Sequence, residues 1–276
     1  MTRGLFRWCG AKRHLVDHVV PLVRDHLSST GGHLISLFAG SLAIERVIGG
    51  GRGGCTLAAD ASPELLNLYA CLQDKPAAVH GALVSLDAEM ERTPEAYREL
   101  GRRPHQPGLW GAARFLWLSA MAFNGVWRVN SDGQMNTGVD RARLAKPAVD
   151  VLPPLDAFES FAGQIHGVRF VFGWEKALAG AEPFDLLLVD PPYGEFDDYT
   201  ADGFDARDHR LLARALHEAV AGRGCALIAF NAPGARSLYE WARCEEFTRS
   251  GCVSSKATKR DPVAEIVITA GLRGPA

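Results

Sequence analysis

The sequence lacks any long apolar run, because its longest apolar stretches span six to eight residues. A helix that crosses a membrane needs about 20 apolar residues, so no membrane association is expected. The start, Met1-Thr2-Arg3-Gly4, lacks the apolar core of a secretory signal, which predicts a cytoplasmic protein. The six cysteines include no Cys-x-x-Cys pair, which argues against both a zinc site and a disulfide scaffold. We therefore expect buried thiols and no metal.

The net charge is also small, because 30 Lys and Arg nearly balance 32 Asp and Glu. A net charge of −2 gives the whole chain no attraction for a polyanion, but the charges are unevenly distributed. Residues 92–146 contain nine basic and four acidic side chains, whereas residues 182–208 contain one basic and nine acidic. The basic segment is either ordinary solvated surface or a surface suited to nucleic acid.

The chain does contain alternating strand and helix patterns. Short apolar runs bounded by Gly or Asp predict buried strands, and apolar residues at helical spacing predict the helices between them. The predicted strands are 33–38, 55–59, 168–172, 184–189, 225–230 and an antiparallel pair at 247–253 and 263–269, and the helices include 12–27, 41–48 and 206–221. Ser62-Pro63-Glu64 has the composition of a helix start.

The alternation stops between residues 74 and 165, where Pro and Gly are frequent, Arg is abundant and the one clear helix is 114–123. We interpret this segment as an inserted subdomain in a domain made of residues 1–73 and 166–276. Strands that alternate with helices predict an α/β fold with a mostly parallel sheet covered on both faces. Ligands of such sheets bind beyond the carboxyl ends of the strands.

Three features follow predicted strands and should therefore meet in one crevice. They are Phe38-Ala39-Gly40, Asp60 and Asp190-Pro191-Pro192-Tyr193. A glycine turn lets a ligand approach the backbone, and an acid about 20 residues further on can bind both hydroxyls of a ribose. The first two features thus indicate a nucleoside cofactor.

The tetrapeptide Asp190-Pro191-Pro192-Tyr193 is the sharpest signal in the chain. Its two prolines fix the backbone, so that the Asp190 carboxylate and the Pro191 carbonyl can face one point. Two such acceptors suit the two N–H bonds of a planar aromatic amine, with the tyrosine ring stacked on the base. The nitrogen lone pair is then free to attack an electrophilic methyl group. A plain strand-ending turn is the structural alternative.

Five segments match the motifs of one family in order. They are Phe6–Lys12, which contains Trp-x-Gly-x-Lys, Phe38–Gly40, Phe123–Asn130 followed by Gly133 and Asn136, Asp190–Tyr193, and Lys259-Arg260 with Glu265. In these segments the chain resembles the Dam-type family, the D12 class and alpha group of S-adenosylmethionine-dependent DNA adenine N6-methyltransferases. The resemblance extends over nearly the whole chain.

The resemblance implies a Rossmann-like sheet of seven strands with the last antiparallel, and a mainly helical target-recognition subdomain at 74–165. It implies S-adenosylmethionine as cofactor, double-stranded DNA as substrate, flipping of the target adenine, a role such as restriction–modification, and a monomer, with a dimer as the alternative. The implied catalytic residues are Asp190, Pro191, Pro192 and Tyr193. Those for the cofactor are Trp8, Lys12, Phe38, Ala39, Gly40, Ser41, Asp60, Ala61, Glu175 and Asp190, and those for DNA are Asn124, Arg128, Asn130, Asn136, Lys259 and Arg260.

Leu42 departs from the family, which has a second glycine at this place in the cofactor loop. We expect Leu42 to start an ordinary helix and to join the apolar face formed by Ala43, Ile44 and Val47. If Leu42 instead fills the cofactor pocket, the chain is an inactive DNA-binding relic. A methyltransferase acting on RNA or on a protein glutamine also remains open, because the same turn serves those substrates.

The acidic stretch 195–208 is expected to form a mobile lid over the flipped base, because its many like charges disfavour a packed resting state. Tyr199 and Phe204 would be the apolar anchors of this lid.

Overall fold

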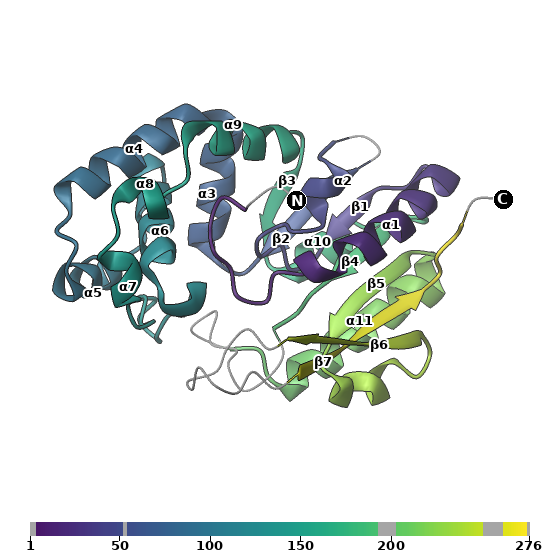
Figure 1. Cartoon of the computed structure of the whole chain (residues 1–276). Helices are drawn as coiled ribbons and strands as arrows, with labels where there is room; N and C mark the ends of the chain where they lie inside the picture. Colours follow the sequence, from purple (N-terminus) through teal and green to yellow (C-terminus); the bar gives the residue numbers. More distant parts are fainter. Residues whose placement is uncertain (1–3, 52–53, 193–202, 251–261, 275–276) are drawn as a thin grey trace. The chain divides into compact units, whose positions relative to one another are not determined.

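The computed structural model describes residues 4–51, 54–192, 203–250 and 262–274. The chain forms two compact units, a sheet unit and a helical unit (Figure 1). The described residues of the sheet unit are 12–51, 54–61, 167–192, 203–250 and 262–274. The helical unit contains residues 4–11 and 62–166.

The sheet unit is built on seven strands in the order β3-β2-β1-β4-β5-β7-β6. The strands are β1 (Leu34–Ser36), β2 (Cys55–Asp60), β3 (Arg169–Phe172), β4 (Leu186–Val189), β5 (Ala226–Asn231), β6 (Arg243–Ser250) and β7 (Pro262–Ala270). Strands β1 to β5 pair in parallel, whereas β7 runs antiparallel to both of its neighbours, β5 and β6. The predicted α/β sheet with an antiparallel last strand is confirmed. Its order differs from the usual doubly wound one because β7 inserts between β5 and β6.

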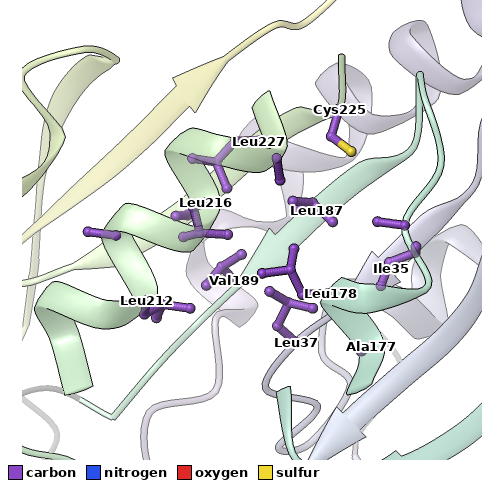
Figure 2. Packing of buried hydrophobic residues seen from close by; sticks show 14 of the residues in the cluster. Ile35, Leu37, Ala177, Leu178, Leu187, Val189, Leu212, Leu216, Cys225 and Leu227 are labelled. Carbon is purple, nitrogen blue, oxygen red and sulfur yellow. The ribbon is translucent and has the colours of Figure 1, made fainter. Parts of the chain in front are cut away.

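Helices precede and connect the strands of this unit. They are η1 (Arg13–Leu15), α1 (Val16–Thr30), α2 (Glu45–Ile48), α10 (Trp174–Ala179), α11 (Ala206–Arg223) and η3 (Pro233–Tyr239). Leu187 and Val189 of β4 pack with Leu178 of α10 and with Leu212 and Leu216 of α11 (Figure 2). Every residue of β4 and β5 is buried, as parallel strands covered on both faces require.

The helical unit is built around α6, in which every residue from Gly111 to Met121 is buried. Helices α3, α4 and α5 pack against α6, and α9 packs against α3 and α4. The helices are α3 (Pro63–Asp74), α4 (Pro76–Glu89), α5 (Pro94–Arg102), α6 (Leu109–Met121), η2 (Phe123–Gly125), α7 (Arg141–Leu144), α8 (Ala148–Val151) and α9 (Leu155–Gln164).

The expectation of a single clear helix between 74 and 165 was wrong, and proline explains the error. Pro76 and Pro94 are each the first residue of a helix, as the sequence predicted for Pro63 outside this segment. At that position the missing N–H would have had no partner inside the helix, and the fixed φ of proline is already helical. The Thr93 side chain also accepts a hydrogen bond from Ala96 N at 3.2 Å, which caps α5. Prolines that look like interruptions in the sequence therefore begin helices.

The expectation of buried thiols holds for only part of the described chain. Cys55 and Cys225 are buried, whereas Cys9, Cys71 and Cys244 are partly exposed, and all five are free thiols. Among the described helices, none is long and apolar enough to span a membrane. Within the same residue ranges, no three His, Cys, Asp or Glu side chains gather in a way that could hold a metal ion.

Candidate active site

The three predicted features lie at the carboxyl ends of adjacent strands β2, β1 and β4. Backbone hydrogen bonds continue the sheet past the end of β1, since Leu37 N donates to Leu188 O at 2.9 Å and Ala39 N donates to Ala59 O at 2.7 Å. The turn after β1 is thereby fixed between the ends of its two neighbours. The convergence that the sequence predicted is observed in the sheet unit.

Asp60 ends β2 and holds the glycine turn in place. Gly40 N donates to the Asp60 Oδ2 atom at 2.9 Å, and Gly173 N donates to the Asp60 carbonyl oxygen at 3.1 Å. Glu175 follows at the exposed start of α10, beyond the end of β3. A carboxylate beside a glycine turn offers the acceptors that a ribose diol needs. These residues therefore fit a nucleoside cofactor.

Asp190, which the sequence predicts to be catalytic, lies directly after β4 and pairs with a buried lysine. The Lys12 Nζ atom is 2.7 Å from Asp190 Oδ1 and 3.2 Å from Glu265 Oε1. His14 Nε2 lies 3.0 Å from the other Glu265 oxygen, Oε2. Burial acts to lower the pKa of Lys12, but the two carboxylates outweigh it and hold this pKa above its ordinary value. The Lys12 ammonium is thus charged and fixed between two acids.

The proline pair after Asp190 is supported by side chains of the sheet unit. The His209 imidazole forms a hydrogen bond with the backbone of Pro192, whose carbonyl must accept because proline has no N–H. His209 packs edge-on to Phe204 at 4.8 Å between ring centroids, and Phe204 packs edge-on to Phe38 at 5.6 Å. Burial lowers the pKa of His209, so the ring is neutral near pH 7.

The backbone at Leu42 corrects one expectation. Leu42 has φ +53°, in the left-handed region, and α2 begins only at Glu45. The turn is closed by the hydrogen bond from Leu42 N to Ala39 O at 2.8 Å, so Leu42 does not start an ordinary helix. Its side chain is nevertheless 1% exposed, as expected. A leucine therefore occupies a glycine-like conformation here, and the burial of its side chain offsets the backbone cost.

We expect Leu42→Gly to lower the free energy of unfolding by about 2 kcal/mol, because about 3 kcal/mol of burial is lost and about 1 kcal/mol of backbone strain is relieved. Ile44→Gly is the matched control, since Ile44 is also buried but has φ −91° and no strain to relieve. In urea unfolding, Ile44→Gly should lower the free energy of unfolding by more than Leu42→Gly does. Binding of S-adenosylmethionine to Leu42→Gly should change little, and a gain of about tenfold would show that the leucine obstructs the pocket.

In the helical unit, residues 122–139 contain a hairpin. Antiparallel bridges join Ala122 to Val139 and Val129 to Met135. Across the hairpin, the Arg128 Nε atom donates to Asn136 Oδ1 at 3.1 Å, which orients the guanidinium.

The turn of this hairpin is held by Asn130. Its side-chain oxygen accepts from Asp132 N at 3.1 Å and from Gln134 N at 2.9 Å. Asn124 precedes the turn with φ +53°, beside the exposed ring of Phe123. The polar residues assigned to DNA binding in this segment therefore share one compact motif.

The comparisons with known proteins decide the family. The family model of the D12 class N6 adenine-specific DNA methyltransferases matches residues 8–250. The chain belongs to this family. The Type II methyltransferase M1.LlaDCHI of Lactococcus lactis subsp. cremoris is 25% identical over 282 residues, covering 97% of this chain and 95% of that protein. The DNA adenine methylase of Vibrio cholerae serotype O1 is 25% identical over 283 residues, covering 96% of this chain and 95% of that protein.

A third relative is the DNA N-6-adenine-methyltransferase of Escherichia phage P1, which is 26% identical over 281 residues. The alignment covers 96% of this D12-class chain and 35% of that protein. D12-class enzymes are adenine-specific DNA methyltransferases, which confirms the family and the class of enzyme that the motifs indicated.

The predicted residues of this D12-class methyltransferase divide between the two units. The sheet unit contains Lys12, Phe38, Ala39, Gly40, Ser41, Asp60, Ala61, Glu175, Asp190, Pro191 and Pro192, and the helical unit contains Trp8, Asn124, Arg128, Asn130 and Asn136. Tyr193, Lys259, Arg260 and the proposed lid residues up to Asp202 lie outside the described residues. The individual roles of all these residues stay predictions.

Sequence reasoning missed three residues near the predicted ones. Glu265 was part of a motif but had no role, although it contacts Lys12. Glu45 interrupts the apolar run Ala43-Ile44-Val47, and an acid in such a run is a signal that could have been read. His209 gave no signal, because only the fold brings it to Pro192.

Proposed function

We propose that this chain transfers the methyl group of S-adenosylmethionine to the exocyclic N6 amine of a flipped-out adenine in double-stranded DNA, at a specific sequence. The observation that carries the proposal is the Asp190 carboxylate, held by buried Lys12 at the same sheet edge as Asp60 and the glycine turn. This arrangement supports a nucleoside cofactor and an acceptor for an amine in one unit of the protein.

The cofactor supplies an electrophilic methyl group on a sulfonium. Asp60 would bind the ribose hydroxyls, and the backbone of Phe38–Gly40 would hold the methionine part of the cofactor. Ser41, Ala61 and Lys12 would line the same part of the sheet unit, and Glu175 would accept from the adenine amine of the cofactor. Trp8, in the helical unit, is a further proposed cofactor residue.

Asp190 and the Pro191 carbonyl accept the two N–H bonds of the target amine. This would draw the nitrogen toward tetrahedral geometry and direct its lone pair at the methyl group. As the new N–C bond formed, the S–C bond would break, S-adenosylhomocysteine would leave, and the methylated nitrogen would lose one proton to solvent. The Asp190 carboxylate also stabilises the positive charge that grows on the nitrogen, which is the largest kind of catalytic effect available to such a site. Tyr193 stacks on the base, as the resemblance implies.

The target amine cannot reach this site inside a duplex, so the adenine is extruded. We propose that residues 74–165 form the target-recognition subdomain and that Asn124, Arg128, Asn130 and Asn136 contact the DNA, together with Lys259 and Arg260. The excess of basic residues in 92–146 supports this role. The exposed Phe123 ring, 48% accessible, is an apolar surface suited to a base.

A methyl-transfer assay tests the function. Purified protein with radiolabelled S-adenosylmethionine should label duplex DNA, and the label should be recovered as N6-methyladenine after digestion. Single-stranded RNA and protein substrates serve as parallel arms. Label in those arms with none in DNA would overturn the proposal, and so would protein that binds DNA but not the cofactor in isothermal titration.

We expect Arg128 to read a base edge in the major groove, with guanine O6 and N7 as the suited acceptors. Arg128→Ala should then remove about 1 to 3 kcal/mol of discrimination at one position of the recognition sequence. Methylation mapping on random DNA checks this. Asn136→Ala should also relax the preference, because it removes both the proposed DNA contact of Asn136 and the contact that orients the Arg128 guanidinium. Arg98→Ala, an exposed arginine paired with Glu95, is the control. If Arg128→Ala keeps the sequence preference of the unaltered chain but binds all DNA sequences more weakly, Arg128 contacts a phosphate and not a base.

A further inference from the structure

We propose that Glu265 is a positioning residue for methyl transfer, which acts on Asp190 through the shared ammonium of Lys12. The inference rests on the proposed function, because it concerns the same catalytic carboxylate. It assigns a task to a residue of β7 that lies more than 70 positions from Asp190 in the sequence.

The geometry links the two carboxylates through one cation. Lys12 Nζ lies 2.7 Å from Asp190 Oδ1 and 3.2 Å from Glu265 Oε1, so the ammonium sits between them. Lys12 is 5% exposed and Glu265 is 1% exposed. Water and salt screen such buried ion pairs only weakly. Removing the charge of Glu265 therefore changes the electrostatic potential at Lys12.

The position of Glu265 is fixed from a second side. His14 Nε2 donates to Glu265 Oε2 at 3.0 Å, which uses the oxygen that does not face Lys12. The ring of Phe230 on β5 lies 5.7 Å from Lys12 Nζ. The carboxylate of Glu265 is therefore oriented by η1 while its other oxygen holds Lys12.

This arrangement matters because Lys12 has two opposed effects on Asp190. Its positive charge attracts the Asp190 carboxylate and fixes its position, as an acceptor requires. The same charge also withdraws electron density from Asp190 and repels the positive charge that grows on the substrate nitrogen. Glu265 offsets part of this charge, so Asp190 is held in place and still stabilises the transition state. A transition-state effect lowers turnover and leaves substrate binding nearly unchanged.

The test is Glu265→Gln, which keeps the shape and an oxygen for Lys12 but removes the charge. We expect kcat to fall by about tenfold or more, with the KM values for DNA and S-adenosylmethionine changed by less than about threefold. Glu265→Asp keeps the charge at a greater distance and should recover part of kcat. Glu218→Gln is the matched control, because Glu218 is an exposed acid of α11 paired with Arg214. Its kcat should equal that of the unaltered chain.

The outcomes separate this inference from the proposed function. If the unaltered chain transfers no methyl group to DNA, the proposed function fails. If the unaltered chain is active and Glu265→Gln has the same kcat, the inference fails. It also fails if kcat and the melting temperature of Glu265→Gln fall while both KM values rise, because that pattern is a loss of structure. If Glu265→Gln is unstable, Glu265→Asp alone decides, and an unchanged kcat in that variant overturns the proposal.

Discussion

Asp190→Ala should reduce methyl transfer by about a thousandfold or more, because the variant loses an acceptor that acts mainly in the transition state. Binding of S-adenosylmethionine should change little, since the residues proposed to contact it belong mainly to other strand ends. Lys12 retains Glu265 as a partner in this variant, so the fold should survive. Single-turnover transfer to duplex DNA and isothermal titration of the cofactor measure the two effects separately.

Two further variants sharpen this prediction. Asp190→Asn keeps an acceptor oxygen but loses the charge and should retain more activity than Asp190→Ala. Asp156→Ala, at an exposed acid in α9, should behave as the unaltered chain. Turnover in Asp190→Ala equal to that of the unaltered chain would refute the catalytic role of this carboxylate.

Glu45→Gln should raise the free energy of unfolding at pH 8 by about 3 kcal/mol. Glu45 is 7% exposed and accepts a hydrogen bond from Ser36 Oγ at 2.6 Å. Burial raises its pKa from the ordinary 4.5 to about 7. Between those two pH values the folded chain holds a proton that the unfolded chain has lost. Stability therefore falls as the pH rises from about 4.5 to 7, and the loss is complete above pH 7.

Urea unfolding between pH 5 and pH 8 checks this prediction. The stability of Glu45→Gln should lack the decline that Glu45 causes, because glutamine keeps an acceptor for Ser36 and carries no proton to lose. At pH 5 the two proteins should differ little. Glu159→Gln, at an exposed acid of α9, should keep the decline. An equal decline in Glu45→Gln would show that another group titrates.

The sequence was sufficient to predict which candidate site residues follow strands of the sheet. Asp60 and Asp190 each follow a short apolar strand, and a residue after such a strand is placed at the ligand-binding edge by the connectivity of the sheet alone. The Ser62 cap of α3 was equally readable, and its side chain accepts from Leu65 N at 3.2 Å. Local rules sufficed in these cases because each involves residues close in the chain.

The helical unit was less readable. Pro76 and Pro94 begin helices whose positions the spacing of apolar residues did not reveal, because a proline gives the same signal at a helix start and at a break. The prediction that Leu42 starts a helix was wrong for a related reason. Its apolar neighbours favour a helix, whereas hydrogen bonding to Ala39 closes a turn with positive φ.

The sequence by itself determined the α/β class, the antiparallel last strand, the family and the residues at the strand ends, since periodicity and motif order are local properties. Only the tertiary structure decided that Lys12, Asp190 and Glu265 share one ion-paired cluster and that Glu45 is buried beside Ser36. The contacts of Lys12 join segments up to 253 positions apart, and no local pattern marks which charged residues will meet across such a separation. Burial strengthens the ion pair of an acid with a nearby cation, or raises the pKa of an acid that has no cation beside it. Whether an acid is buried depends on how the whole fold packs.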